Sequence, residues 1–208
     1  AESVEFRNFA IMRCLDDAMS LDTDNSHVWI HNMDLFYGKK GGAADQAKGD
    51  GTVDIKGDSK YVTVAYNRFW DNGKASMCGM KSETGENWIT YHHNWFDHSD
   101  SRMARVRTMS VHMYNNYYQH CDVYGIGATS GSSIFMESNY FDAVKRPIMS
   151  SLQGTDAKGD GTFSGEKGGL IKAYGNVFAN KPDNFSYIPY SENNTSFDAY
   201  EVSNPSEQ

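Results

Sequence analysis

The sequence predicts an all-β fold in which short strands coil into a solenoid and pair with neighbouring coils as parallel sheets. The first observation behind this is a motif that returns along the chain: an alternating strand, then Asn, one variable residue and usually an aromatic. The second is composition, because 19 Gly, 13 Tyr and 11 Phe with only 4 Pro suit many short strands joined by tight turns. The third is that few stretches carry apolar residues at helical spacing.

The motif has five strong copies in one register, and their asparagines are Asn67, Asn94, Asn116, Asn139 and Asn176. Two weaker copies precede them, with Asn8 and Asn32 at the same position of the motif. A base period of roughly 22 to 24 residues with occasional insertions is typical of stacked coils, because insertions lengthen loops on one face. A β-propeller or sandwich with chance Asn-aromatic pairs is the alternative.

The chemistry of asparagine explains its place in the motif. When coils stack, the Asn of one coil lies above the Asn of the next. Each side-chain amide can then donate a hydrogen bond to one neighbour and accept one from the other, which forms a ladder. We expect the aromatic two residues later to stack in the interior in the same way.

Length and charge limit the function classes. The 208 residues suffice for one core, and we expect residues 1–208 to form a single domain. A net charge of −8 argues against a nucleic-acid partner, and the lack of an apolar run of about 18 residues argues against a transmembrane helix. The three cysteines form no CxxC pair, so a structural zinc site is not expected. An acidic polysaccharide stays possible, because a divalent cation can carry a polyanion across an acidic surface.

The first chemistry-bearing segment runs from Asp45 to Lys56. Asp54 and Lys56 are two residues apart, so both point to the same face of a strand, and Asp50 lies just before that strand. Carboxylates gathered at a strand entrance suit a hard cation such as Ca²⁺, which takes oxygen ligands. A solvated acidic turn is the alternative, because Asp-Gly is a common turn pair.

The second segment contains three arginines within six positions: Arg102, Arg105 and Arg107. Uncompensated, such charges repel one another, so this cluster is a candidate site for an anion. The alternative is that the arginines pair with the nearby Asp97 and Asp100.

In their order and approximate spacing, several segments resemble polysaccharide lyase family 1, the pectate lyases. These segments are Val28–Ile30, Gly49–Lys56, Tyr61–Val64, Lys74, His93–Phe96 and Arg102–Arg107. The resemblance covers nearly the whole chain up to about Phe178, and the DGxxDIK and RxxRVR pieces are specific only in combination.

This resemblance implies a right-handed, single-stranded parallel β-helix with a substrate groove on one sheet. It implies a pectate lyase that cleaves polygalacturonate, the acidic form of pectin, by Ca²⁺-dependent β-elimination. It assigns Ca²⁺ to Asp50 and Asp54, uronate carboxylates to Lys56, Lys74 and Arg107, and removal of the C5 proton to Arg102. We also expect a monomer that is secreted to the extracellular space or periplasm and binds neither nucleic acid nor membrane.

Three departures from the family pattern matter. The family pattern implies a third calcium ligand after Trp29-Ile30, where this chain has His31. Neutral imidazole is a poor Ca²⁺ ligand, so Asp45, or alternatively Asp34, is expected to supply the missing carboxylate. The usual Pro before the middle arginine is Ala104, which removes a constraint on φ. Family members are also longer, so we expect this chain to lack their N-terminal coils.

Arginine is a poor base because its ordinary pKa exceeds about 12, so we expect surrounding positive charge and an alkaline optimum. Rival functions remain open at this point. A pectin lyase would need no metal, and a glycoside hydrolase would need paired carboxylates, for which Asp16 and Asp17 are the only adjacent acids. A non-catalytic β-helical pectin-binding module is the third alternative.

Overall fold

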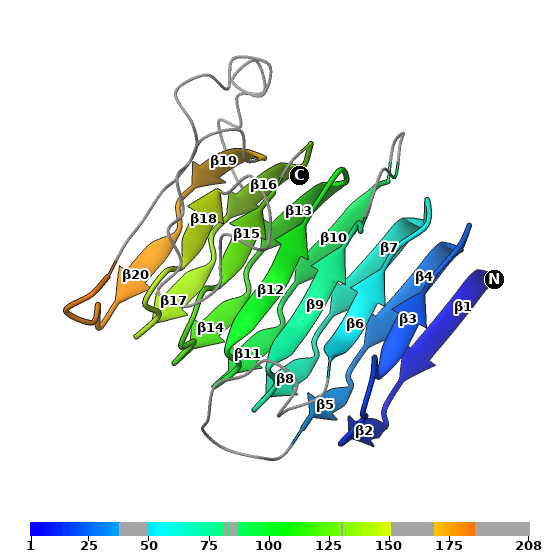
Figure 1. Cartoon of the computed structure of the whole chain (residues 1–208), viewed down its shortest axis with the longest axis horizontal. Coiled ribbons are helices and arrows are strands. Elements are labelled where there is room, and N and C mark those ends of the chain that lie inside the picture. The colour runs from blue at the N-terminus through cyan, green and yellow to red at the C-terminus, as the bar shows by residue number, and fades with distance from the viewer. Residues whose placement is uncertain (38–49, 81–82, 84–86, 130, 151–168, 186–208) are drawn as a thin grey trace.

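The computed structural model describes residues 1–37, 50–80, 83, 87–129, 131–150 and 169–185. Across these ranges the chain forms twenty strands and no helix, and the strands stack side by side from the N-terminal to the C-terminal end (Figure 1). Every strand pairing is parallel, and the strands of each sheet are three apart in sequence order. The chain is therefore a parallel β-helix with three strands in each coil.

Sheet A contains the first strand of each coil: β1 (Glu2–Arg7), β4 (Ser26–His31), β7 (Lys60–Ala65), β10 (Ile89–His92), β13 (Ser110–Tyr114), β16 (Ser133–Glu137) and β19 (Leu170–Tyr174). Sheet B contains the second: β2 (Ala10–Met12), β5 (Asp34–Phe36), β8 (Arg68–Trp70), β11 (Trp95–Asp97), β14 (Tyr117–Gln119), β17 (Tyr140–Asp142) and β20 (Val177–Ala179). Sheet C contains the third: β3 (Met19–Leu21), β6 (Gly51–Ile55), β9 (Lys74–Cys78), β12 (Ser101–Val106), β15 (Ile126–Ala128) and β18 (Ile148–Ser150).

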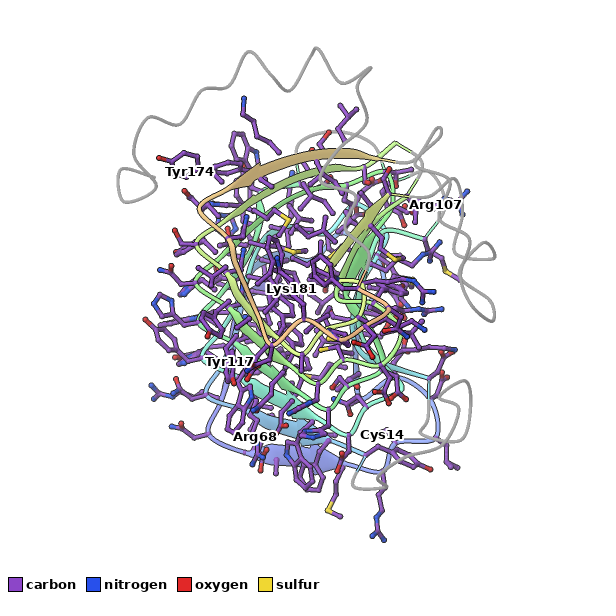
Figure 2. All side chains as sticks on the ribbon, turned by 90° about the vertical axis from the view of Figure 1, so that its left-hand side faces the viewer. Cys14, Arg68, Arg107, Tyr117, Tyr174 and Lys181 are labelled. Atoms are coloured by element: carbon purple, nitrogen blue, oxygen red, sulfur yellow. The ribbon has the colours of Figure 1, made fainter. Side chains whose placement is uncertain are left out.

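The core fills the space that the three sheets enclose (Figure 2). Alternation along each strand decides what enters it: Val62 and Val64 of β7 are fully buried, whereas Thr63 between them is only partly buried. A column of rings confirms the predicted interior stacking, with centroids of neighbouring rings 4.4 to 5.3 Å apart. From coil to coil the column contains Phe69, Phe96, Tyr118, Phe141 and Phe178.

The predicted asparagine ladder lies at the bend between sheets A and B and joins the five asparagines of the strong motif copies. Asn94 shows the pattern: its Oδ1 accepts from the backbone N and the Nδ2 of Asn67, both at 3.1 Å. Its Nδ2 donates to Val64 O at 2.8 Å and to Asn116 Oδ1 at 3.0 Å. The same exchange continues through Asn139 to Asn176. Each amide is thus satisfied by the coils on either side.

The predicted alignment of the two weaker copies of the motif with the five strong copies is wrong by one residue. Asn8 and Asn32 occupy the preceding position, where the backbone has positive φ (59° and 52°). The residues at the ladder position are Phe9 and Met33, and the backbone N–H of Met33 donates to Asn67 Oδ1 at 2.9 Å. Asn adopts positive φ more readily than most residues. Asn therefore occurs at the bend for two different reasons: positive φ at one position and the hydrogen-bonded ladder at the next.

Within the described ranges, the structure has no helix that is long and apolar enough to cross a bilayer.

Candidate active site on sheet C

The outer face of sheet C has a groove of about 740 Å³, which we call the sheet C groove. It crosses four coils, because its residues come from β3, β6, β9, β12 and the segments that flank them. Its lining is Asp16, Asp17, Ser20, Asp22, Asp50, Asp54, Lys56, Lys74, Met77, Met80, Arg102, Arg105 and Arg107. Acidic side chains gather on the N-terminal coils and arginines on and just after β12, with two lysines between them.

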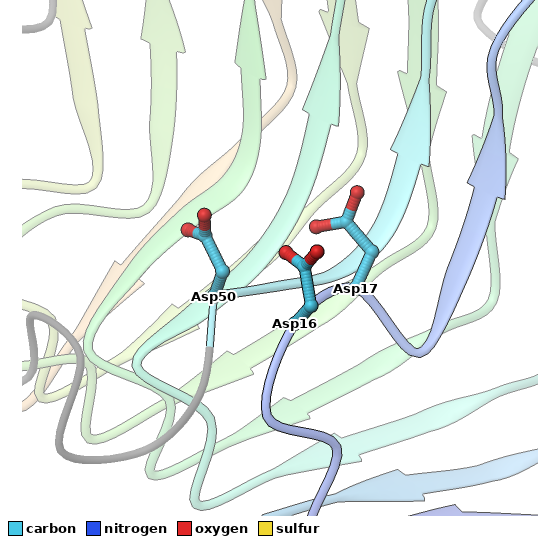
Figure 3. Close-up of side chains that lie close together, drawn as sticks. All are labelled: Asp16, Asp17 and Asp50. Carbon is cyan, nitrogen blue, oxygen red and sulfur yellow. The ribbon is translucent and has the colours of Figure 1, made fainter.

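Three carboxylates converge at the entrance to β3 and β6. Asp16 and Asp17 come from the segment before β3, Asp50 from the segment before β6, and all three point to the same side of the sheet (Figure 3). One oxygen of each lies within 4.8 Å of the others. The stacking explains this: β3 pairs with β6 so that Met19 lies beside Val53, which brings Asp17 next to Gly51. Gly51 N–H donates to Asp17 Oδ1 at 3.1 Å.

Asp54 extends the acidic cluster beneath the surface. Its side chain is almost fully buried, and its Oδ1 has no hydrogen-bond partner. Burial raises the pKa of Asp54 to about 7, and the charge of Asp17 acts in the same direction, while Lys56 and Arg102 oppose it. A cation that approaches from the groove would therefore displace the proton of this carboxyl group into solvent and bind the carboxylate.

The two lysines of the groove are paired with these aspartates. Lys56 Nζ lies 3.1 Å from Asp17 Oδ2 and 3.2 Å from Asp22 Oδ1, and Lys74 Nζ lies 2.7 Å from Asp50 Oδ1. Burial disfavours the charge on Lys56, but its hydrogen bonds with Asp17 and Asp22 outweigh burial and raise its pKa. Both ammonium groups are thus held at the acidic cluster.

A β-bulge in β12 places all three arginines on the groove side. Strict alternation would put Arg102 on the face opposite Arg105 and Arg107. The pairing of β12 with β9 shifts by one residue between Met103 and Arg105, so that Ala104 is the extra residue. Met103, Ala104 and Val106 then enter the core and are fully buried, while the arginines remain outside.

The arginines differ from the lysines in their partners. No carboxylate of the described residues lies within ion-pair distance of Arg102, Arg105 or Arg107. Arg107 donates to Met80 O at 3.1 Å, Arg105 approaches the Met77 sulfur at 3.5 Å, and the Nε atoms of both are buried without a partner. The alternative partner Asp97 instead binds Arg68 at 2.7 Å on sheet B. The arginine cluster therefore suits an external anion.

The match to a family follows from the sequence as a whole. The family model for pectate lyase matches residues 13–173, which include every residue of the sheet C groove. The chain belongs to the pectate lyase family. Among curated members, the pectate trisaccharide-lyase of Bacillus licheniformis is 30% identical over 154 residues, which are 72% of this chain and 44% of the relative. Pectate lyase C of Dickeya chrysanthemi is 33% identical over 135 residues, 63% of this chain and 36% of the relative. The chain thus spans less than half the length of these relatives.

Solved pectate lyases share the fold. A pectate lyase from Bacillus sp. N165 in complex with trigalacturonate superposes with a TM-score of 0.73 and 26% identity, over 99% of this chain and 64% of that one. Pectate lyase C from Erwinia chrysanthemi, at pH 9.5 with 30 mM Ca²⁺, gives a TM-score of 0.68 at 23% identity, over 88% of this chain and 55% of that one. The predicted right-handed parallel β-helix is confirmed.

For a chain of the pectate lyase family, the predicted site residues gather as expected. Asp50, Asp54, Lys56, Lys74, Arg102 and Arg107 all line the sheet C groove. Asp45 lies outside the described residues. Asp34 accepts a hydrogen bond from Trp70 Nε1 at 2.6 Å on sheet B and does not line the groove.

His31 lies away from the sheet C groove. His31 ends β4 of sheet A, where its ring nitrogens bind Glu5 at 2.8 Å and Asn32 at 2.7 Å. It does not line the groove, so a carboxylate at this position would not join the acidic cluster. Asp16 and Asp17, which the sequence argument noted only as an adjacent pair of acids, supply the further carboxylates. Aligning the third strand of each coil would have found them, because β3 and β6 are stacked.

The acidic cluster fits a hard divalent cation by three observations. Its donors are all carboxylate oxygens, which Ca²⁺ prefers. Asp54 Oδ1 is a buried oxygen with no partner. Gly51 also leaves room in front of the cluster, since a Cβ there would lie 2.3 Å from Asp54 Oδ1 and 2.8 Å from Asp17 Oδ1. Asp16, Asp17, Asp50 and Asp54 are therefore the residues that could hold the ion.

Proposed function

We propose that the protein is a calcium-dependent pectate lyase that cleaves polygalacturonate by β-elimination. The observation that carries this proposal is the meeting of five aspartates and three arginines across one groove, with two lysines between them. A polyanion needs such a surface, because its carboxylates can be neutralised by cations while the hydroxyl-bearing backbone lies across the coils. Membership of the pectate lyase family supports the same activity.

The chain's own residues can perform the elimination as follows. Lys56, Lys74 and Arg107 hold uronate carboxylates, which fixes the sugar ring in the groove. Neutralising the carboxylate next to C5 makes the C5 proton more acidic, because the charge that develops on removal of that proton is stabilised. Arg102, in its neutral guanidine form, accepts the proton and becomes a guanidinium ion. The electron pair of the C5–H bond forms the C4–C5 double bond, and the C4–O bond breaks. The departing oxygen takes a proton from solvent, so no oxidant or reductant is required.

Calcium fits this scheme at the acidic cluster. When bound by Asp16, Asp17, Asp50 and Asp54, the ion supplies positive charge that binds and polarises a substrate carboxylate. Asp45, which lies outside the described residues, stays a proposed additional ligand.

The decisive experiment follows the ultraviolet absorbance of the unsaturated uronide released from polygalacturonate, with Ca²⁺ and with a chelator. We expect product only with Ca²⁺. The Arg102→Lys variant keeps the positive charge but shortens the reach, and we expect it to lose about a hundredfold or more in rate, as for loss of a positioned general base. Arg68→Lys on the outer face of sheet B is the matched control and is expected to retain activity.

Each rival function has a distinct result in this assay. Product that survives the chelator would indicate a pectin lyase. New reducing ends without absorbance would indicate a hydrolase. Binding of polygalacturonate without any product would indicate a non-catalytic module.

We also propose that the protein acts outside the cytoplasm, in the periplasm or beyond the cell, because a polymeric substrate does not cross a membrane. A single chain forms the whole of the described groove, so a monomer suffices for the proposed reaction. For the same reason we propose that residues 1–208 act as one β-helical domain.

A further inference from the structure

Arg105 is the groove arginine that the proposed reaction does not use, and its surroundings are unusual for a cation. Its terminal nitrogen contacts only the thioether sulfur of Met77, at 3.5 Å, which is a weak acceptor. Its Nε is buried without a hydrogen-bond partner. Lys56 and Lys74 in the same groove, by contrast, each contact an aspartate. Arg105 has therefore lost part of its hydration without gaining an ionic partner among the described residues.

The position of Arg105 is built by the fold. The bulge at Ala104 turns Arg105 outward, and sheet pairing places it between Met77 of β9 and Gly127 of β15. Gly127 has no side chain, and the ring of Tyr124 lies in the space above it, since a Cβ there would be 2.9 Å from Tyr124 Cε2. Met77 and the Tyr124 ring thus lie on the two neighbouring strands' sides of Arg105, and Arg105 itself lines the groove.

Electrostatics oppose this arrangement as it stands. Burial lowers the pKa of Arg105, and the like charges of Arg102 and Arg107 act in the same direction, whereas Tyr124 and Asp54 act against them. An anion that enters the groove would relieve both costs, because it would pair with the guanidinium and offset the repulsion.

Arg105 and Arg107 have different neighbours on the groove wall. Arg105 reaches toward Met77, whereas Arg107 donates to the carbonyl of Met80, three residues further along the neighbouring chain segment. Each guanidinium is therefore held by its own contact, and a uronate chain that crosses the coils can present a separate carboxylate to each.

We propose that Arg105 binds a second uronate carboxylate, adjacent to the one at which elimination occurs, and so selects for runs of unesterified uronates. This proposal rests on the proposed function, because it names what the same groove recognises. A methyl ester at that second uronate removes the negative charge and leaves the guanidinium unpaired, so esterified pectin is the disfavoured substrate.

The test compares Arg105→Met with Arg105→Lys on two substrates, polygalacturonate and partly methyl-esterified pectin. Methionine removes the charge and matches the apolar walls, while lysine keeps the charge. For Arg105→Met on polygalacturonate we expect KM to rise about tenfold while kcat falls less than about threefold. On partly esterified pectin we expect KM to rise no more than about threefold, because fewer substrates offer the second carboxylate. Arg105→Lys is expected to recover part of the loss.

A merely structural role gives a different pattern. Equal losses on both substrates, or a fall in kcat with unchanged KM, would overturn the proposal, and so would an unchanged KM on polygalacturonate. Thermal unfolding of both variants checks that they fold as the wild type does.

Calorimetry with a short oligogalacturonate separates this proposal from the proposed function. If the wild type forms no unsaturated product but binds the oligomer about tenfold more tightly than Arg105→Met does, the carboxylate site stands and the lyase reaction fails. If product forms and both proteins bind alike, the carboxylate site alone fails. If the wild type neither binds nor cleaves the oligomer, both fail.

Discussion

The asparagine ladder and the sheet C groove are built from the same coils but treat polar groups in opposite ways. Along the ladder, every amide from Asn67 to Asn139 gives and receives hydrogen bonds within the protein. In the groove, Asp54 Oδ1 and the Nε atoms of Arg105 and Arg107 are buried without partners. Buried polar atoms without partners are uncommon in native proteins. Of the six in the described part of the chain, three lie together in this groove, while Arg68 Nε, Tyr118 Oη and Glu137 Oε2 lie on three different strands elsewhere. The ladder therefore stabilises the fold, and the groove retains unpaired groups for a ligand.

The difference follows from how the two regions repeat. The ladder repeats one residue type in every coil, so each coil satisfies the next. The groove carries different residues in each coil, with acids at β3 and β6 and in the segments that flank them, Lys74 on β9 and arginines on and just after β12. Stacking places these side chains near one another without making them mutual partners. A solenoid can thus vary one face chemically while the others hold the coils together.

The largest expected effect is a loss of stability when the asparagine ladder is interrupted. Asn116→Ala removes an amide whose Oδ1 accepts from Asn94 N and Nδ2 and whose Nδ2 donates to Tyr91 O and Asn139 Oδ1. Each group left unpaired in the core costs about 1–3 kcal/mol, so we expect a loss of about 4 kcal/mol in the free energy of unfolding. Chemical denaturation measures this loss.

The neighbouring residue provides the control. Asn115 is exposed and has a φ of 53°, which Gly adopts without strain, so Asn115→Gly is expected to change stability by less than about 0.5 kcal/mol. If Asn116→Ala destabilises the protein no more than this control, the ladder is not a main source of stability.

The next effect concerns the groove and depends on pH. Because burial raises the pKa of Asp54 to about 7, the folded protein keeps this proton over a range in which the unfolded chain, with an aspartate pKa of about 4, has lost it. The contribution of Asp54 to stability is therefore full below about pH 4 and is lost as the pH rises to about 7. Metal binding runs the other way, since it needs the carboxylate, and we expect Ca²⁺ affinity to fall about tenfold per pH unit below 7.

Two measurements check this pair of signs. Unfolding with a chelator present is expected to show a stability decline from about pH 4 to about pH 7 in the wild type that Asp54→Asn lacks. Calorimetric titration of the wild type with Ca²⁺ across the same range is expected to show affinity rising with pH. A Ca²⁺ affinity that does not change with pH would show that the proton on Asp54 does not compete with the ion.

These two regions also differ in how far the sequence predicts them. The ladder and the ring column from Phe69 to Phe178 were predictable because one residue type recurs at one position of each coil. The alignment predicted for Asn8 and Asn32 was wrong because the preceding position of the bend has positive φ and therefore also favours Asn. Repetition therefore locates the coils but does not tell two roles of the same residue apart.

Prediction of the groove depended on whether its residues were contiguous. Asp50, Asp54 and Lys56 belong to one short segment, and the spacing of a strand suffices to put the last two on one face. Asp17 reaches the same place from the previous coil, 34 residues away from Gly51, through strand pairing that the short strand β3 does not reveal in sequence. The bulge at Ala104 likewise has no sequence signal, although it decides that three arginines share the groove.

The smallest expected effect concerns competition between Lys74 and a metal ion for Asp50. Lys74 Nζ is 2.7 Å from Asp50 Oδ1, so an ion bound by Asp50 must displace the ammonium group or share the carboxylate with it. We expect Lys74→Met to bind Ca²⁺ about threefold to tenfold more tightly, because a competing positive charge is gone, while its rate on polygalacturonate falls because a carboxylate contact is lost. Calorimetry without substrate measures the first and the absorbance assay the second. Lys60→Met, on sheet A, is the control and is expected to change neither.

Unchanged or weaker Ca²⁺ binding in Lys74→Met would show that the ion and the lysine occupy Asp50 independently. Tighter Ca²⁺ binding together with a lower rate on polygalacturonate would show that metal binding frees Lys74 for the substrate.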